Sequence, residues 1–309
     1  MAIIETFALS RQFGKTTAVE DVTLTVEAGE VLGFLGPNGA GKTTTIRMLG
    51  GMIAPTRGYA IVAGHRTDRD PEQLHQIVGI LTQMPGLYDR LSARRNLEYF
   101  ASFYPSIESQ SQAEKYLKLM GLWERRNSKV GTFSKGMKQR LALARALVHE
   151  PKVLFLDEPT AGLDPEAAGE VRQLIRDMRG EGRTIFVCTH NLGEAEVLCS
   201  RIAVLRTRLL ALDTPEQLRR RFFRRQIVVQ LEALDARVMD AVKKLPFVQE
   251  MREEGNQLIL ELADSERNRP ELVKAIVETG GRVVGVSEKQ YPLEDVYLRL
   301  IREENQNES

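Results

Sequence analysis

The chain contains 309 residues, which is enough for two domains or for one large domain with an appendage. It has 43 lysines and arginines against 42 aspartates and glutamates, so its net charge of +1 does not favour a nucleic-acid partner. Hydrophobic residues make up 42% of it, which excludes wholesale disorder, yet no apolar run approaches the roughly 18–20 residues that span a bilayer. The first residues lack a secretory signal pattern, and two cysteines, Cys188 and Cys199, make no disulfide framework, so we expect a protein of a reducing cytoplasm.

The first predicted domain covers residues 1–218 and begins with an antiparallel sheet. Segments rich in β-branched residues, Ile3–Phe7 and Val22–Val26, supply strands of that sheet. The apolar run Val31–Leu35 is typical of a buried strand. A glycine loop and a run with helical spacing, Lys42–Leu49, follow it. The pattern predicts a strand, a glycine loop and a helix in succession.

A helical region is predicted over about residues 87–148, before the chain returns to the core sheet. Apolar residues three and four apart predict helices at Asn96–Tyr104, Ser111–Met120 and Met137–Val148. The apolar runs Val153–Leu156 and Thr184–Cys188 indicate parallel core strands, and the helix-like stretch Pro165–Arg179 separates them. A right-handed strand–helix–strand unit is therefore expected.

Residues 219–309 form a second predicted domain, which begins with the basic segment Arg219–Arg225. Strand, helix, strand, strand, helix and strand then follow in the order of a ferredoxin-like domain. The predicted strands are Gln226–Glu232, Phe247–Arg252, Gln257–Leu262 and Arg282–Ser287, and the predicted helices are Ala236–Leu245 and Pro270–Thr279. A closing helix, Leu293–Arg302, and a frayed polar tail complete it. The arginines suit a solvated helix face better than a contact with anionic lipid.

The glycine loop is the strongest motif in the sequence. It fits the phosphate-loop pattern G-x-x-x-x-G-K-[ST], with the strand before and the helix after that such a loop requires. Backbone amides there can face phosphate oxygens, while Lys42 reaches the β- and γ-phosphates and Thr43 coordinates Mg²⁺. A glycine-rich turn with a surface lysine is the alternative interpretation. The expected nucleotide contacts are Gly36, Pro37, Asn38, Gly39, Ala40, Gly41, Lys42, Thr43 and Thr44.

Two acids follow the predicted strand Val153–Leu156. Because the carboxyl end of a core strand delivers side chains to the binding crevice, Asp157 is expected to hold the metal. Glu158 is expected to act as a general base or to orient the attacking water. A strand that merely ends in exposed acids is the alternative, which the neighbouring phosphate loop disfavours.

The stretch Phe133–Arg140, with the sequence FSKGMKQR, resembles the L-S-G-G-Q signature of the ABC transporter ATPases. Ser134 and Gly136 match that signature, whereas Lys135 and Met137 depart from it, as does the leading phenylalanine. The form is similar to that of exporter ATPases whose membrane partners belong to the second, non-importer class of bacterial permeases. The implied fold is an α/β phosphate-loop NTPase core of the ABC type with an antiparallel β subdomain and a helical subdomain, plus a small C-terminal α+β accessory domain.

The resemblance implies roles for four further parts of the site. Gln83 would be the Q-loop glutamine that contacts Mg²⁺ and water, and His190 the switch histidine that contacts the γ-phosphate. Asp164 would lie in the D-loop, and Phe13 would stack on adenine. Without the family context each has a plainer explanation: a polar strand end for Gln83, an ordinary histidine, core packing for Phe13 and a helix N-cap for Ser134.

As a member of this family, the chain would be the ATPase subunit of an ABC exporter, using ATP and Mg²⁺. The signature would face the phosphate loop of a second copy or of a paired ATPase subunit. Separately encoded membrane permease subunits would hold the protein at the cytoplasmic face of the cell membrane. In the family, the segment corresponding to Met84–Leu97 contacts the membrane subunit, and Arg95 departs from the usual glutamate there. No nucleic-acid partner is expected.

Two other functions fit the sequence less well. A soluble ABC-type ATPase acting on nucleic acid or ribosomes is disfavoured by the single phosphate loop, the absence of a long heptad insert and the balanced charge. A regulatory subunit that binds ATP without hydrolysing it is disfavoured by the presence of Glu158 and His190. The sequence does not indicate the cargo.

Overall fold

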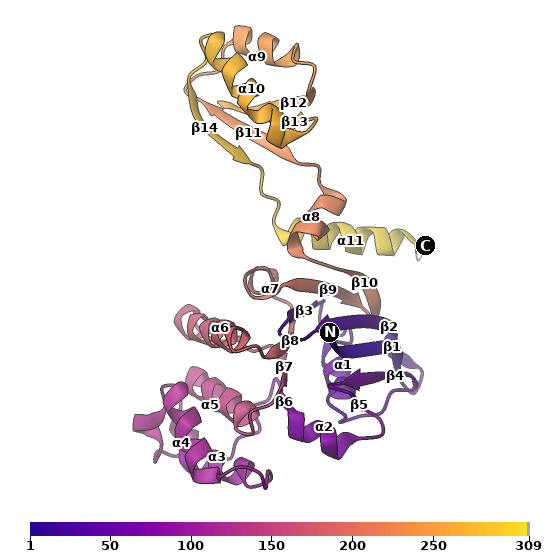
Figure 1. The fold of residues 1–309 in the computed structure, drawn as a ribbon, viewed down its shortest axis with the longest axis vertical. Coiled ribbons are helices and arrows are strands. Elements are labelled where there is room, and N and C mark those ends of the chain that lie inside the picture. Colours follow the sequence, from indigo (N-terminus) through magenta and orange to yellow (C-terminus); the bar gives the residue numbers. More distant parts are fainter. Residues whose placement is uncertain (308–309) are drawn as a thin grey trace. The chain divides into compact units, whose positions relative to one another are not determined.

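The computed structural model describes residues 1–307, and the chain divides into two compact units, Met1–Pro215 and Glu216–Ser309 (Figure 1). The division falls a few residues before the domain boundary expected after Leu218. Each unit has a hydrophobic core of its own. Among the described residues, no helix is both long enough and apolar enough to cross a membrane.

A four-stranded antiparallel sheet opens the first unit. Its strand order is β2-β1-β4-β5, and its strands are β1 (Ala2–Phe13), β2 (Thr16–Glu27), β4 (Arg57–Val62) and β5 (His65–Arg66). Buried residues of β2 alternate with exposed ones, as expected for a sheet with one face on the core. The predicted strands Ile3–Phe7 and Val22–Val26 thus lie within longer ones.

A six-stranded sheet forms the centre of the first unit. Its order is β10-β9-β3-β8-β7-β6, and its strands are β3 (Val31–Leu35), β6 (Val78–Leu81), β7 (Val153–Asp157), β8 (Thr184–Thr189), β9 (Arg201–Arg206) and β10 (Arg208–Asp213). Strands β3, β8, β7 and β6 run parallel to one another, so their carboxyl ends share one edge. Every residue of β3, β7 and β8 is buried, which explains their continuous apolar runs.

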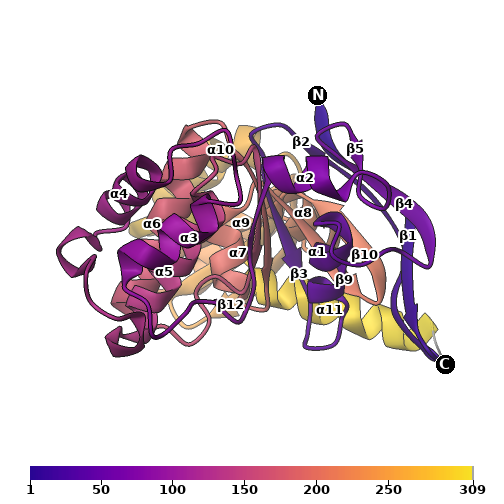
Figure 2. The same cartoon turned by 90° about the horizontal axis from the view of Figure 1, so that it is seen from below.

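Helices surround this sheet, and three of them form the helical region predicted over about residues 87–148. Figure 2 shows that region on one side of the first unit and the antiparallel sheet on the other. The helices of the unit are α1 (Lys42–Leu49), α2 (Pro71–Ile77), α3 (Ala93–Ala101), α4 (Ser109–Leu119), α5 (Lys135–Leu147), α6 (Pro165–Gly180) and α7 (Leu192–Leu198), with short 3₁₀ turns at Trp123–Arg125 and Val130–Thr132.

The second unit contains the predicted β-α-β-β-α-β order. Its elements are α8 (Pro215–Phe222), which begins at the boundary, β11 (Gln226–Leu231), α9 (Ala236–Lys243), β12 (Val248–Glu254), β13 (Gln257–Leu262), α10 (Ser265–Glu278), β14 (Val283–Glu288) and α11 (Leu293–Asn307). The antiparallel strand order β12-β13-β11-β14 is that of a ferredoxin-like sheet. Apolar residues of β11 and β13 pack on α9 and α10 and form the core.

Three local predictions were wrong. Strands β9 and β10 were not predicted, although each contains four consecutive apolar residues between charged ends. Helix α10 does not begin at Pro270, since Asp264 Oδ1 accepts a hydrogen bond from Arg267 N at 3.3 Å and caps an earlier turn. Helix α11 continues past Arg302 to Asn307, and its buried positions recur every three or four residues as far as Glu304. The last two residues of the predicted polar tail lie outside the described residues.

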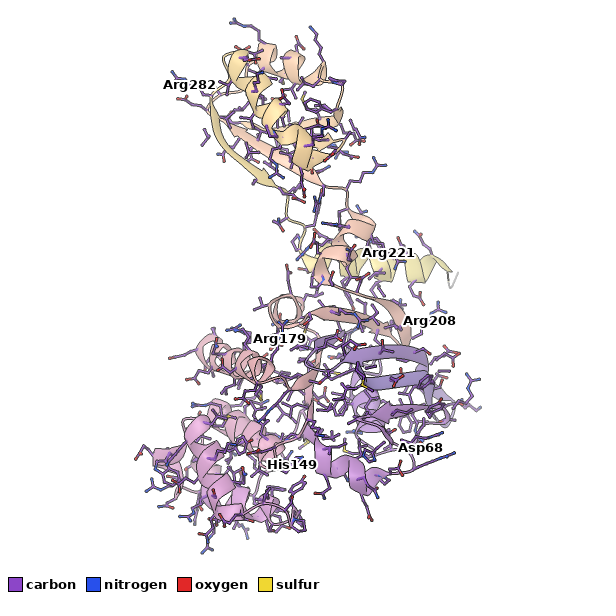
Figure 3. The ribbon with its side chains drawn as sticks, in the orientation of Figure 1. Asp68, His149, Arg179, Arg208, Arg221 and Arg282 are labelled. Atoms are coloured by element: carbon purple, nitrogen blue, oxygen red, sulfur yellow. The ribbon has the colours of Figure 1, made fainter. Side chains whose placement is uncertain are left out.

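The basic segment Arg219–Arg225 finds its counter-charges inside the second unit. Arg219 Nε donates to the carbonyl oxygen of Tyr291 at 2.7 Å, and Arg221 lies on α8 (Figure 3). The other arginines form the ion pairs Arg220–Glu216, Arg224–Glu261, Arg225–Glu266 and Arg225–Glu288. Glutamates of the second unit thus pair with Arg220, Arg224 and Arg225.

His149 is a buried titratable group of the first unit (Figure 3). Its Nε2 lies 3.1 Å from the carbonyl oxygen of Val78, and its ring stacks on Tyr104 with 4.1 Å between centroids. Burial lowers the pKa of His149 to about 4, against which the hydrogen bond to Val78 acts. The imidazole is therefore neutral in the folded protein at neutral pH.

We expect His149 to make the first unit sensitive to acid. Below a pH of about 6.5 the imidazole takes up a proton in the unfolded chain, whereas in the folded chain it does so only at about pH 4. His149 therefore lowers the free energy of unfolding by up to about 3 kcal/mol as the pH falls from about 6.5 to about 4. His149→Phe keeps an aromatic ring against Tyr104 but does not titrate. Unfolding followed by the single tryptophan, Trp123, should therefore show a shallower loss of stability with acid in the variant. Identical pH slopes would contradict the assignment.

Candidate active site

The loop between β3 and α1 is a tight cradle of backbone atoms. Gly41 has a φ of +98°, and a Cβ there would lie 2.3 Å from the carbonyl oxygen of Ala18. A Cβ on Gly36 would lie 2.4 Å from the carbonyl oxygen of Leu205. Gly41 provides no side-chain cap and the first turn of α1 contains no acid, so the positive end of this helix is available to an anion.

Lys42 places a positive charge inside the curve of this loop. Its side chain is 7% exposed, and its Nζ donates to the carbonyl oxygens of Gly36 at 2.7 Å and Pro37 at 3.1 Å. The same Nζ lies 3.8 Å from Glu158 Oε1. Because the ammonium group is held by backbone carbonyls and shielded from water, its field acts strongly on a neighbouring phosphate.

Thr43 and Asp157 meet beside the lysine. Thr43 Oγ1, from the first turn of α1, donates to Asp157 Oδ2 at 2.7 Å, at the end of β7. Asp157 is only 2% exposed, and burial raises the pKa of its carboxyl while the Thr43 hydrogen bond opposes that shift. A hydroxyl and a carboxylate are oxygen ligands of the kind Mg²⁺ uses together with substrate phosphates. The two residues therefore fit a Mg²⁺ site.

Glu158 adopts a strained backbone conformation. Its φ of +52° lies in the left-handed region, which costs a residue other than glycine about 1–3 kcal/mol. Its amide donates to the carbonyl oxygen of Cys188 at 2.9 Å, which ties the loop after β7 to β8. The carboxylate is 10% exposed, and Glu158 Oε1 lies 2.8 Å from Nδ1 of the exposed His190. A buried carboxylate and an accessible imidazole thus meet at the edge of the site.

These groups line one cavity of about 650 Å³. Among the described residues it is lined by Phe13, Ala18, Pro37, Asn38, Gly39, Ala40, Gly41, Lys42, Thr43, Thr44, Gln83, Asp157, Glu158, Ala161 and His190. Phe13 is 47% exposed and therefore is not packed in the core, and the guanidinium of Arg11 lies 4.6 Å from its ring centroid. Gln83, just beyond β6, also lines the cavity. The cavity has the size of a typical small-ligand site.

Three expected site residues, Ser134, Gly136 and Asp164, are not among those that line this cavity. Ser134 Oγ accepts from Met137 N at 3.2 Å and caps α5, and Asp164 Oδ1 accepts from Ala167 N at 2.9 Å and caps α6. A Cβ on Gly136 would lie 3.0 Å from the Ala167 Cβ, so the starts of these two helices are neighbours. Within one chain they form a second, separate group.

Sequence reasoning missed the residues that support the loop after Glu158. Gln139 Nε2 of α5 donates to the carbonyl oxygen of Pro159 at 2.7 Å. Thr160 Oγ1 donates to Glu194 Oε1 at 2.8 Å, and Glu194 is 3% exposed. The one signal for Glu194 in the sequence was an acid beside buried apolar positions of a short helix.

Comparisons with known proteins agree with this geometry. Residues 19–161 match the family described as ABC transporter, and residues 214–301 match the C-terminal domain of DrrA1-3-like ATP-binding proteins. The chain is 34% identical over 301 residues to the bacitracin transport ATP-binding protein BcrA of Bacillus licheniformis, covering 97% of both chains. It is 33% identical over 300 residues to the Nod factor export ATP-binding protein I of Rhizobium sp. (strain N33), covering 96% of both.

A solved structure is similar to the first unit. It is a dimeric, post-hydrolysis state of an ATP-binding cassette bound to ADP and Pi, with a TM-score of 0.63 and 26% sequence identity, and the match covers 68% of this chain and 98% of that one. The cradle of backbone amides, the lysine and the paired acids define a phosphate-loop ATPase. The chain belongs to the family of ABC transporter ATP-binding proteins, and it is the ATP-binding and ATP-hydrolysing subunit of an exporter-type system.

We expect Gly41→Ala to abolish ATP binding while most of the fold persists. The new Cβ would collide with the carbonyl of Ala18, and because both are backbone atoms the loop itself must move. Gly64→Ala is the matched control, since Gly64 has a φ of +88° but open space around it, so it adds only left-handed strain of about 1–2 kcal/mol. Titration with ATP should give an unchanged Kd for the control. Wild-type affinity in Gly41→Ala would show that the cradle is not the phosphate site.

Proposed function

We propose that two copies of this chain, or this chain and a paired ATPase subunit, enclose ATP between the phosphate loop of one subunit and the Ser134 group of the other. The observation that carries the proposal is that Ser134, Gly136 and Asp164 form a separate group, outside the cavity of their own chain. Their helix starts suit an anion, as the phosphate loop does, so each group is half of a phosphate site. A head-to-tail dimer completes both.

Catalysis in this arrangement is in-line attack of water on the γ-phosphate. Lys42 and the partner's Ser134 group stabilise the charge that develops on the phosphoryl oxygens. Glu158, aimed by its strained backbone, accepts or orients the proton of the attacking water, and His190 holds the phosphoryl group from the side of that carboxylate. Thr43, Asp157 and Gln83 would hold Mg²⁺, which supplies positive charge to the phosphates. Phe13 would support the adenine ring.

Glu158→Gln tests the assignment of the base. The amide keeps the shape of the side chain but cannot take up a proton, so ATP binding should persist while turnover falls by roughly 10²–10⁴-fold. Phosphate release under saturating ATP and a parallel ATP titration measure the two effects. Unchanged turnover would remove Glu158 from the mechanism.

The head-to-tail site makes a prediction about mixed dimers. Lys42→Ala and Ser134→Arg should each inactivate the protein alone, because every composite site then contains one defective half. In a heterodimer with Lys42→Ala in one subunit and Ser134→Arg in the other, both changes fall in the same composite site, and the second site is intact. This heterodimer, purified through a different affinity tag on each subunit, should therefore hydrolyse ATP at up to about half the wild-type rate if the sites act independently. If both residues serve the same cavity, the heterodimer stays inactive.

We further infer that membrane permease subunits dock on the helical region, at the cytoplasmic face of the membrane. The support is a cluster of exposed aromatic rings on and beside α3: Tyr88, Tyr99 and Phe103 are 46%, 43% and 58% exposed, and the Tyr99 ring contacts the two other rings edge to face. Exposed apolar patches of this kind mark interaction sites. The buried Asn96 ties Tyr88 to α3 through both its backbone groups. Cargo selection is then assigned to the membrane subunits.

A further inference from the structure

Glu194, on α7, is a buried carboxylate that the mechanism above does not use. It is 3% exposed, and burial raises the pKa of its carboxyl, whereas hydrogen bonds from Thr160 and Thr189 favour the ionised form. A buried acid is costly unless its oxygens are satisfied, so the position of its partners carries information. One partner lies in the loop after β7 and the other is the last residue of β8, so both are close in the chain to the proposed catalytic groups Glu158 and His190.

The two oxygens of Glu194 accept hydrogen bonds from two different segments. Thr160 Oγ1 donates to Oε1 at 2.8 Å, and Thr160 lies in the loop after β7, two residues after Glu158. Thr189 Oγ1 donates to Oε2 at 3.0 Å, and Thr189 is the last residue of β8, directly before His190. One carboxylate therefore bridges the loop that follows β7 and the end of β8.

The start of α7, which carries Glu194, is itself held by hydrogen bonds. Asn191 caps α7, where its Oδ1 accepts a hydrogen bond from the backbone amide of Glu194 at 3.0 Å. The amide of Asn191 donates to Thr189 Oγ1, also at 3.0 Å. The Thr189 hydroxyl thus donates to Glu194 and accepts from Asn191, which leaves it one orientation. The side chain of Glu194 is held at its backbone and at both oxygens.

The loop that it holds is the one under strain. Glu158 has a left-handed backbone, and such conformations persist only where the surroundings over-determine them. The backbone amide of Glu158 donates to the carbonyl oxygen of Cys188, and two residues later the hydroxyl of Thr160 donates to Glu194. Glu158 Oε1 and His190 Nδ1 meet at 2.8 Å, so a shift of either bridged segment would separate them.

We propose that Glu194 is a positioning residue, which braces the loop after β7 against the end of β8 so that Glu158 and His190 hold the attacking water together. The inference rests on the roles given to Glu158 and His190 in the proposed function. Glu194 does not line the nucleotide cavity, so it acts only through these two segments. Its loss therefore affects the chemical step and leaves the binding of ATP to the phosphate loop in place.

The test compares steady-state ATPase kinetics of full-length variants. Glu194→Ala should lower kcat on the order of 10–100-fold, the effect of misplacing a catalytic group by about an ångström, with KM for ATP within about twofold of wild type. Glu194→Gln should recover part of the loss, because its amide can accept from one threonine and donate to the other. Glu196→Gln, an exposed carboxylate on the same helix, is the matched control and should leave kcat unchanged.

A second measurement separates positioning from general damage. In a Glu158→Gln background, Glu194→Ala should reduce the residual turnover by less than about threefold, since the pairing of Glu158 with His190 that it maintains is already lost. If the two losses multiply fully, or if Glu194→Ala alone hydrolyses ATP at the wild-type rate, the brace is refuted. If Glu194→Ala does not fold, Thr160→Val and Thr189→Val remove the donors with little change of shape and should each lower kcat. Wild-type kcat in both would refute the brace too.

The same variants distinguish a failure of the brace from a failure of the proposed function. If Glu158→Gln alone leaves turnover unchanged, the assigned role of Glu158 fails, whatever the Glu194 variants show. If Glu158→Gln lowers turnover and the Glu194 variants do not, only the brace fails.

Discussion

The site depends on four parallel strands that end at one edge of the central sheet. Strands β3, β8, β7 and β6 are neighbours in that order, so the phosphate loop, His190, the two acids and Gln83 emerge side by side although they are far apart in the chain. Parallel strands expose their next residues in one direction, and this is the crevice in which open α/β sheets bind ligands. The fully buried strands make that edge rigid.

Rigidity at this edge is combined with local strain. Gly41 and Glu158 both adopt left-handed backbones, one to bring amides toward phosphate and one to turn a carboxylate toward His190. Glycine tolerates the first conformation without cost, whereas glutamate does not, so the second must be held by its surroundings. The bridging carboxylate of Glu194 and the bond from Gln139 to Pro159 are the contacts that hold it. The strained residue and its supports belong to different elements of the first unit.

Most elements of the second unit could be predicted from the spacing of apolar residues. Its strand and helix order followed from apolar spacing, and the antiparallel pairing agrees with the ferredoxin-like order. Helix α10 begins earlier than predicted because Asp264 caps a first turn that contains no apolar residue to indicate a helix. The charge of Arg219–Arg225 had two interpretations in the sequence. Only the structure shows the glutamates that neutralise it, since they lie on β13, α10 and β14.

The sequence by itself determined the phosphate loop, because its chemistry depends on residues within one short segment whose spacing sets the geometry. It also indicated Asp157 and Glu158, since a run of buried apolar residues ends at them. The tertiary structure alone decided that Glu194 joins Thr160 to Thr189, because a hydrogen bond between residues 34 apart leaves no periodic trace in the chain. It also decided that Ser134 lies outside its own cavity. A site formed by one short segment can be predicted from its residues, whereas contacts between distant segments depend on how the sheet brings the ends of its strands together.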